Sequence, residues 1–88
     1  MTISEIKAAN AARGFHFFER GTLKFFGSRV SSQTFGDVFI TSEVDFHGRN
    51  RRYTVRRLND RGAVDTIGEF RQYATLSDAV AAAKAVRS

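Results

Sequence analysis

Two alternating segments joined by a turn decide the fold: VFITSEVDF at residues 38–46, HGRN at residues 47–50, and RRYTVRRL at residues 51–58. In the first segment, apolar side chains fall mainly on the even positions and polar ones on the odd positions, which is the period of a half-buried strand. In the second segment, Tyr53 and Val55 share the face opposite Arg52 and Arg56, and Arg51 and Arg57 lie at the two ends of the apolar face. The stretch therefore predicts an antiparallel hairpin with one apolar and one polar face.

Two further strands are predicted on either side of this hairpin. A second turn, NDRG at residues 59–62, is rich in residue types that tolerate positive φ, and residues 63–70 follow it as a strand. On the other side, residues 29–32 have β character and add a fourth strand if they pair. We therefore expect an antiparallel meander of three to four strands.

A helix is predicted at each end of the chain. Thr2 and Glu5 have the spacing of a capping box, and Gly14 is a natural stop for the helix that they begin. Near the C-terminus, Thr75 or Ser77 caps a helix whose small apolar residues recur at helical spacing. We predict a single α+β domain over residues 1–88, with both helices packed against the sheet.

An aromatic block lies between the first helix and the strands. It contains five phenylalanines, with a helical turn that Thr22 caps and Gly27 ends. We interpret the block mainly as core, because large aromatic side chains dominate the cores of small proteins. The alternative is an apolar surface that docks a partner or a second copy of the chain, as in a virion or other structural component. The five are Phe15, Phe17, Phe18, Phe25 and Phe26.

The charge excess of the chain is confined to the hairpin and the turn after it. The whole sequence has 14 Lys and Arg against 9 Asp and Glu, a net charge of +5. Residues 49–61 contain six arginines and one aspartate, so the rest of the chain is neutral. Arginine forms bidentate bonds to phosphate and carboxylate, so this cluster predicts a binding face for an acidic partner. The six are Arg49, Arg51, Arg52, Arg56, Arg57 and Arg61.

The strand period places Arg52 and Arg56 on the outward face, where we expect both to be exposed. Neighbouring side chains on one strand face are about 6.5–7 Å apart, close to the phosphate spacing of a nucleic-acid strand. Phe39 falls on the outward face too and is the candidate for stacking on a base. The alternative is a solvated face whose charge Glu43 and Asp45 of the neighbouring strand neutralise.

Residue types that carry catalysis are sparse. The chain has no cysteine, and its two histidines lack the spacing of a metal site. We therefore predict no enzyme, no metal, no cofactor and no small-molecule substrate. No apolar run has the length of a membrane span or a signal peptide, so we expect a cytoplasmic protein without a membrane partner. The oligomeric state is left open.

Several stretches resemble a group of small proteins carried by bacteriophages and prophages. They are Ile6–Asn10, Thr22–Phe26, Ser28–Val30, Arg52–Arg56, Asp65–Phe70 and Tyr73–Thr75. In size, localised charge and lack of catalytic groups, the chain is also similar to phage anti-CRISPR inhibitors, particularly those that act on type I surveillance complexes.

This resemblance implies a non-enzymatic inhibitor inside a bacterial host. Its arginine hairpin would dock on acidic residues of a Cas subunit, so that its body blocks access of nucleic acid to the complex. The alternative is a small module that binds DNA or RNA directly with the same arginines.

Overall fold

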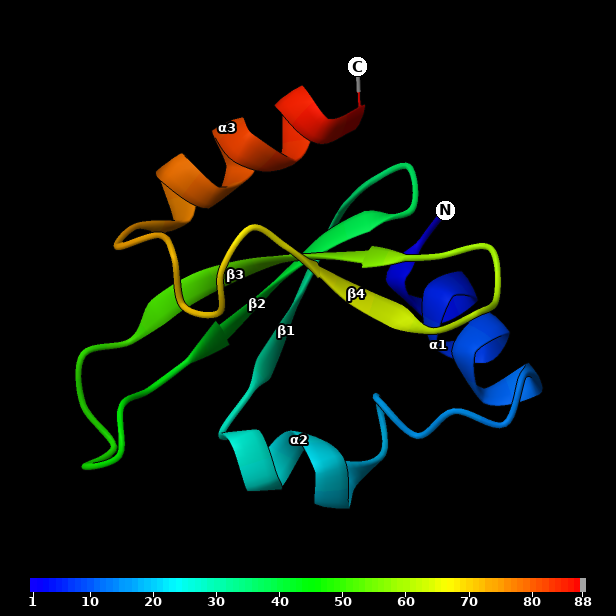
Figure 1. Cartoon of the computed structure of the whole chain (residues 1–88), viewed down its shortest axis with the longest axis horizontal. Coiled ribbons are helices and arrows are strands. Elements are labelled where there is room, and N and C mark those ends of the chain that lie inside the picture. The colour runs from blue at the N-terminus through cyan, green and yellow to red at the C-terminus, as the bar shows by residue number, and fades with distance from the viewer. Residues whose placement is uncertain (88) are drawn as a thin grey trace.

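The computed structural model describes residues 1–87, and the predicted domain includes one further residue, Ser88, outside them. A four-stranded antiparallel sheet in the order β1-β2-β3-β4 lies between helices from both ends of the chain, which confirms the predicted α+β meander (Figure 1). The elements are α1 (Ile3–Ala12), α2 (Arg20–Phe26), β1 (Arg29–Phe35), β2 (Val38–Glu43), β3 (Arg52–Leu58), β4 (Val64–Ile67) and α3 (Leu76–Arg87).

The central strands pair antiparallel, as predicted, with Ile40 opposite Val55 and Glu43 opposite Arg52. The predicted fourth strand is confirmed as β1, and it continues to Phe35. Its register against β2 shifts between Val30 and Thr34, so β1 bulges in its middle.

Two predicted strands are shorter in the structure. The strand predicted over residues 38–46 ends at Glu43, because the Asp45 side chain forms hydrogen bonds within the turn that follows. Its carboxylate accepts the backbone N–H of His47 (3.0 Å) and that of Arg49 (2.8 Å), and this geometry competes with the strand ladder. The strand predicted over residues 63–70 ends at Ile67, just before Gly68 with its φ of 78°.

The helix starts follow the predicted capping in two of three cases. Thr2 and Glu5 form the capping box of α1, and the Thr75 hydroxyl accepts the N–H of Asp78 at the start of α3. The predicted cap of the helical turn in the aromatic block is wrong, because α2 begins at Arg20, ahead of Thr22. Its predicted stop is confirmed, since Gly27 adopts the left-handed conformation.

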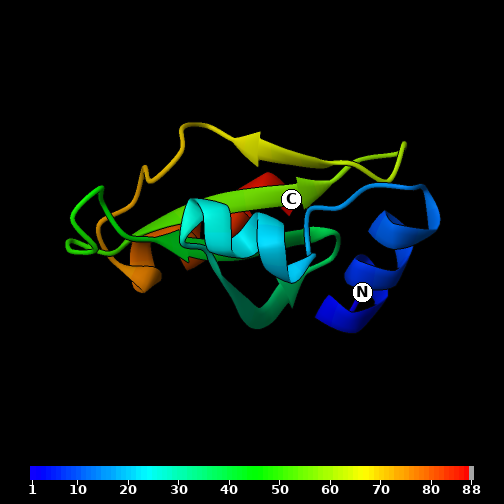
Figure 2. The same cartoon turned by 90° about the horizontal axis from the view of Figure 1, so that it is seen from below.

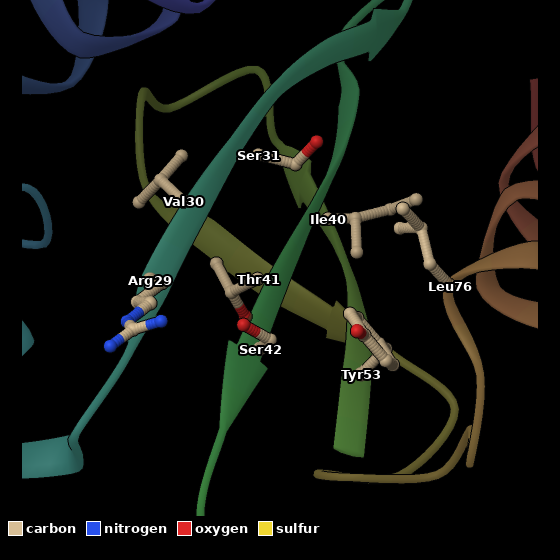
Figure 3. Close-up of a pocket in the computed structure, with 8 residues that line it drawn as sticks. All are labelled: Arg29, Val30, Ser31, Ile40, Thr41, Ser42, Tyr53 and Leu76. Carbon is tan, nitrogen blue, oxygen red and sulfur yellow. The ribbon is translucent and has the colours of Figure 1, made fainter. Parts of the chain in front are cut away.

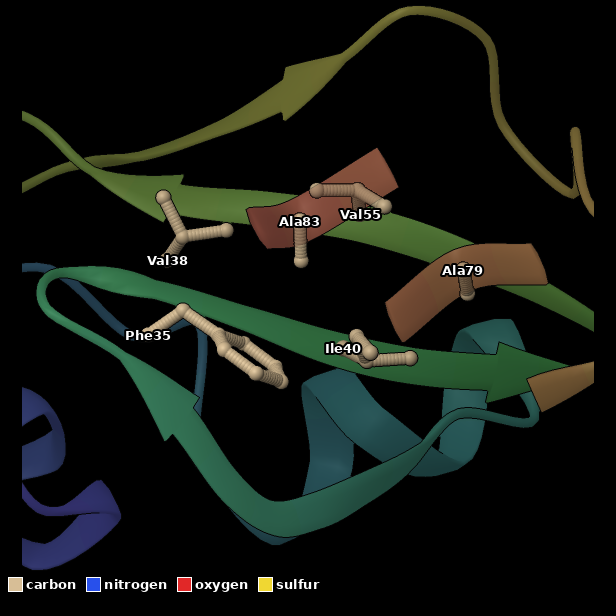
Figure 4. Close-up of a cluster of buried hydrophobic side chains, with 6 residues drawn as sticks. All are labelled: Phe35, Val38, Ile40, Val55, Ala79 and Ala83. Atoms are coloured by element: carbon tan, nitrogen blue, oxygen red, sulfur yellow. The ribbon is translucent and has the colours of Figure 1, made fainter. Parts of the chain in front are cut away.

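Helix α3 covers one face of the sheet. Its Ala79 and Ala83 are fully buried against Ile40 and Val55 of the central strands (Figure 4). Small alanines let the helix backbone approach the sheet closely, so larger side chains from the strands fill the layer between them. This cluster is the main apolar core.

Helix α1, together with Phe17 and Phe18 of the aromatic block, lies against the opposite face of the sheet, and α2 is on the same side (Figures 1 and 2). Ile6 packs with Phe39 and Leu58 in a second cluster, and the Asn10 amide donates to the Gly62 carbonyl oxygen (2.8 Å). Because both faces are covered, every residue of β2 is buried. The polar face of the predicted hairpin therefore does not lie in water.

Candidate binding surface

The arginine at the centre of the predicted binding face points into the protein. Arg56 is only 8% exposed, and its Nη2 lies 3.3 Å from Oε2 of the fully buried Glu43. Its Nε donates to the Thr41 hydroxyl (3.1 Å) and its Nη1 to the Thr66 hydroxyl (2.6 Å). The prediction that Arg56 is exposed is wrong, because this guanidinium is the cation of a buried ion pair.

Glu43, the anion of this pair, is fully satisfied. The hydroxyls of Ser28 and Thr54 each donate to its carboxylate at 2.7 Å. Burial lowers the pKa of Arg56, and the charge and hydrogen bond of Glu43 oppose that effect. Within residues 1–87 no buried side-chain nitrogen or oxygen lacks a hydrogen-bond partner. The network is therefore part of the structural core, as expected of a paired buried charge.

Two aromatic rings pack over the Arg56 guanidinium of this network. The Arg56 guanidinium carbon lies 5.4 Å from the ring centroid of Phe17 and 5.6 Å from that of Phe70. Both distances fall within the range of a cation–π contact. Phe70 remains about half exposed, so it separates the buried pair from solvent.

Three other arginines of the predicted face are also engaged. Arg52 is half-buried, and it donates from Nε to the carbonyl oxygen of Arg71 and from Nη2 to that of Gln72, both at 2.8 Å. Arg51 bonds to the backbone and hydroxyl oxygens of Ser42. On the other side of the sheet, Arg57 pairs with Asp37 at 3.4 Å. The prediction that Arg52 is fully exposed is therefore wrong.

Only two of the six arginines extend freely into solvent. In the described part of the chain, the guanidinium groups of Arg49 and Arg61 have no hydrogen bond or ion pair. They flank the seven residues of β3, which span about 23 Å at roughly 3.3 Å per residue. Their loops lie at opposite ends of the sheet (Figure 1). The six guanidinium groups therefore do not share one face.

The predicted stacking residue is buried as well. Phe39 has no exposed surface, and its ring centroid lies 5.4 Å from that of Phe18 and 6.1 Å from that of Phe17. The alternation placed Phe39 on the correct face of β2, but α1 and the aromatic block cover that face. Its predicted exposure is wrong for this reason.

Exposed rings occur instead at the hairpin end of the sheet. A groove of about 430 Å³ runs between the end of α2 and the loop over residues 44–51, with Lys24 and Asp45 also lining it. Four phenylalanines line it, and they are 84%, 50%, 99% and 49% exposed, in the order of the chain. They are Phe25, Phe26, Phe46 and Phe70, and we call this feature the aromatic groove.

Sequence reasoning missed the groove for two local reasons. The aromatic block does supply core in Phe17 and Phe18, but α2 is only seven residues long and cannot bury both of its adjacent phenylalanines. Phe46 was placed on the apolar face of a strand that ends earlier. The signal for Phe46 was its position between Asp45 and Gly48, since aspartate and glycine are both typical turn residues.

A second, smaller pocket of about 130 Å³ lies where β1 bulges away from β2 (Figure 3). Tyr53, Ile40 and Leu76 form its apolar side, and Arg29 stands at the opposite rim. This volume is below the roughly 300–1,000 Å³ that is typical of small-molecule sites.

Both histidines lie at the surface of the protein. His16 and His47 are both exposed, and His16 bonds to Glu19 at 2.7 Å. Residues 1–87 contain no group of three His, Cys, Asp or Glu side chains that could hold a metal ion. Over the same residues, no helix combines the length and apolar character that crossing a bilayer requires.

Comparison with known proteins finds one family. Residues 2–84 match a family model described as a family of unknown function, DUF7447. No curated protein matches the chain, and no solved structure does.

Proposed function

We propose that this chain, which belongs over residues 2–84 to the DUF7447 family of unknown function, is a non-enzymatic protein that binds a partner protein. The observation that carries the proposal is the aromatic groove, in which four phenylalanine rings are about half or more exposed. Clustered exposed rings on so small a protein are typical of an interaction site, because their hydration is unfavourable until a partner covers them.

We propose to test one form of this function first: an inhibitor that occupies a surface of a host defence complex, such as a type I surveillance complex, in the bacterial cytoplasm. The resemblance of the sequence to phage proteins supports this form. The contact differs from the predicted one, because Arg56 is buried in an ion pair with Glu43 and Arg52 is half-buried against backbone carbonyl oxygens. The aromatic groove and the neighbouring loop over residues 44–51 replace the arginine hairpin as the docking surface.

Purified type I surveillance complexes provide the test. We expect immobilised wild-type protein to capture such a complex, and the double change Phe25→Ala with Phe46→Ala to abolish the capture. Phe15→Ala is the matched control, because Phe15 is also exposed but lies outside the groove. Capture that survives the double change would show that the groove is not the contact, and absence of capture by wild type would reject this choice of partner.

One observation favours a second candidate, a module that binds single-stranded nucleic acid. Phe46 is almost fully exposed, and Arg49, with its free guanidinium, lies in the same loop. A ring that stacks on a base beside a cation that contacts phosphate is the composition of such sites.

Fluorescence anisotropy with labelled single-stranded DNA, duplex DNA and RNA distinguishes the two candidates. Binding through phosphate contacts should weaken steeply between about 50 and 200 mM salt and tolerate any sequence. Tight, salt-sensitive binding that Phe46→Ala abolishes would replace the protein-binding proposal. We expect no such binding, because four exposed phenylalanine rings dominate the lining of the groove, and apolar side chains of a protein cover such rings better than a phosphate backbone does.

A further inference from the structure

Two arginines beside the aromatic groove are held in place by backbone carbonyl oxygens. Arg52 donates only to carbonyl oxygens, those of Arg71 and Gln72. Arg71 likewise donates from its side chain to the carbonyl oxygens of Glu43 and Asn50. A carbonyl oxygen fixes the direction of a guanidinium but carries no net charge, so these hydrogen bonds pair neither arginine with a carboxylate.

The carboxylates at this end of the sheet are mostly committed elsewhere. Asp45 accepts three hydrogen bonds from its own loop, from the N–H groups of His47 and Arg49 and from the Asn50 side chain. Glu43 is buried and paired with Arg56. One exposed carboxylate, that of Glu69, lies next to Phe70 in the chain. Asp45 lines the groove and attracts Arg71, so the carboxylates of Asp45 and Glu69 stand against five cations, which are Lys24, Arg49, Arg51, Arg52 and Arg71.

The opposite end of the sheet is close to neutral. Arg57 is paired with Asp37 there, and Asp65 accepts from the Asn59 side chain in the same region. Asp60 adjoins Arg61 in the turn. Acidic residues therefore balance the arginines at this end, so the charge of the protein steers an acidic partner to the groove end.

From this asymmetry we infer that the aromatic groove takes a segment of the partner protein in which apolar anchor residues are flanked by aspartate or glutamate. The inference rests on the proposed function and specifies the chemistry of the partner. The apolar anchors would cover the rings, and the carboxylates would meet the cations around them.

The size of the groove fits an anchoring contact. A phenylalanine buries about 150–250 Å² when it is fully covered, so four rings with these exposures supply several hundred Å². A stable interface needs about 800 Å² from each partner, so the rings provide much of one side. A second copy of the chain would bring the same cations face to face across a two-fold axis, which like-charge repulsion disfavours.

Selection from a displayed library of short randomised peptides on the immobilised full-length protein tests the inference. We expect enriched peptides to combine Leu, Phe or Trp with several Asp or Glu residues. Labelled versions of these peptides should bind wild type, lose about tenfold or more in affinity to Phe46→Ala, and lose severalfold to Arg49→Glu. Phe15→Ala and Arg61→Glu are the matched controls and should bind like wild type, because both residues are exposed outside the groove.

The outcomes separate the inference from the proposed function. Peptides that depend on Phe46 but show no acidic preference would overturn the inference and leave the groove as the docking site. Peptides whose binding is indifferent to Phe46→Ala would overturn both. Failure to enrich any peptide, or binding of a labelled oligonucleotide that Phe46→Ala abolishes, would overturn the inference as well.

Discussion

The two faces of the sheet are both buried, but by different chemistry. On the α3 face, Ile40 and Val55 pack against alanines, and burial of apolar surface stabilises the contact. On the other face, Glu43 and Arg56 form an ion pair that hydroxyl groups and two aromatic rings enclose. A strand alternation thus shows which residues share a face, but it does not show whether that face meets water.

The difference has an energetic consequence. A buried apolar residue can be trimmed at the cost of a cavity, whereas removing one partner of a buried ion pair leaves an uncompensated charge. The polar face should therefore be the more sensitive one to single changes. The predictions below test this ranking, from the largest expected effect to the smallest.

Glu43→Ala should have the largest effect. It leaves the Arg56 guanidinium without its anion, and we expect the free energy of unfolding to fall by about 3–5 kcal/mol. Urea unfolding followed by circular dichroism measures the loss. A fall below about 1 kcal/mol would mean that Arg56 reaches water in the variant, and the ranking of the two faces would then be wrong.

Ile40→Ala is the corresponding change on the α3 face. We expect it to lower the free energy of unfolding by about 2–5 kcal/mol, through lost burial and the cavity that it leaves. The same urea experiment applies. Ser32→Ala on the exposed part of β1 is a suitable reference for a change within the sheet that leaves the core intact.

Replacing both members of the ion pair sharpens the comparison. Glu43→Leu combined with Arg56→Met removes both charges together, and we expect it to cost about 1–3 kcal/mol, less than Glu43→Ala alone. The remaining cost comes from hydroxyl groups, such as that of Thr54, which lose a charged partner. If the double variant is less stable than Glu43→Ala, the charges contribute net stability and the comparison must be revised.

The aromatic groove should behave differently from both faces. Phe46→Ala should change the free energy of unfolding by no more than about 0.5 kcal/mol, because the ring is almost fully exposed. Phe39→Ala, at a fully buried ring on the polar face, should cost about 3–5 kcal/mol. Thermal unfolding of the two variants side by side makes this test, and equal losses would show that Phe46 is packed in solution.

The smallest effect concerns the loop beside the groove. The Arg49 backbone N–H, with the other donors of the loop, holds the pKa of Asp45 below its ordinary value. A lowered carboxyl pKa stabilises the folded loop above the unfolded value of about 3.9, and this contribution is lost as the pH falls through the lower folded pKa.

Amide chemical shifts of His47 and Arg49 report this transition directly. We expect both to move as the pH falls through that range, and to move much less in Asp45→Asn. Wild-type shifts that stay constant to strongly acid pH would show that the carboxylate does not hold the loop.

Local sequence patterns determined the elements of this protein. The capping box of Thr2 and Glu5, the stop at Gly27 and the alternation of Tyr53 and Val55 each depend on neighbours a few residues away, so they could be predicted without the fold. The predicted segment boundaries were less accurate where a side chain, such as that of Asp45, accepts hydrogen bonds from its own turn and so ends the strand early.

Only the tertiary structure decided which residues meet solvent. Phe17 and Phe70, far from Arg56 along the chain, cover its guanidinium and turn a predicted binding face into core. Phe46 becomes exposed because its strand stops before reaching it. Side-chain alternation is set by the backbone of one strand, but burial depends on what other segments place over it, and that information is not local.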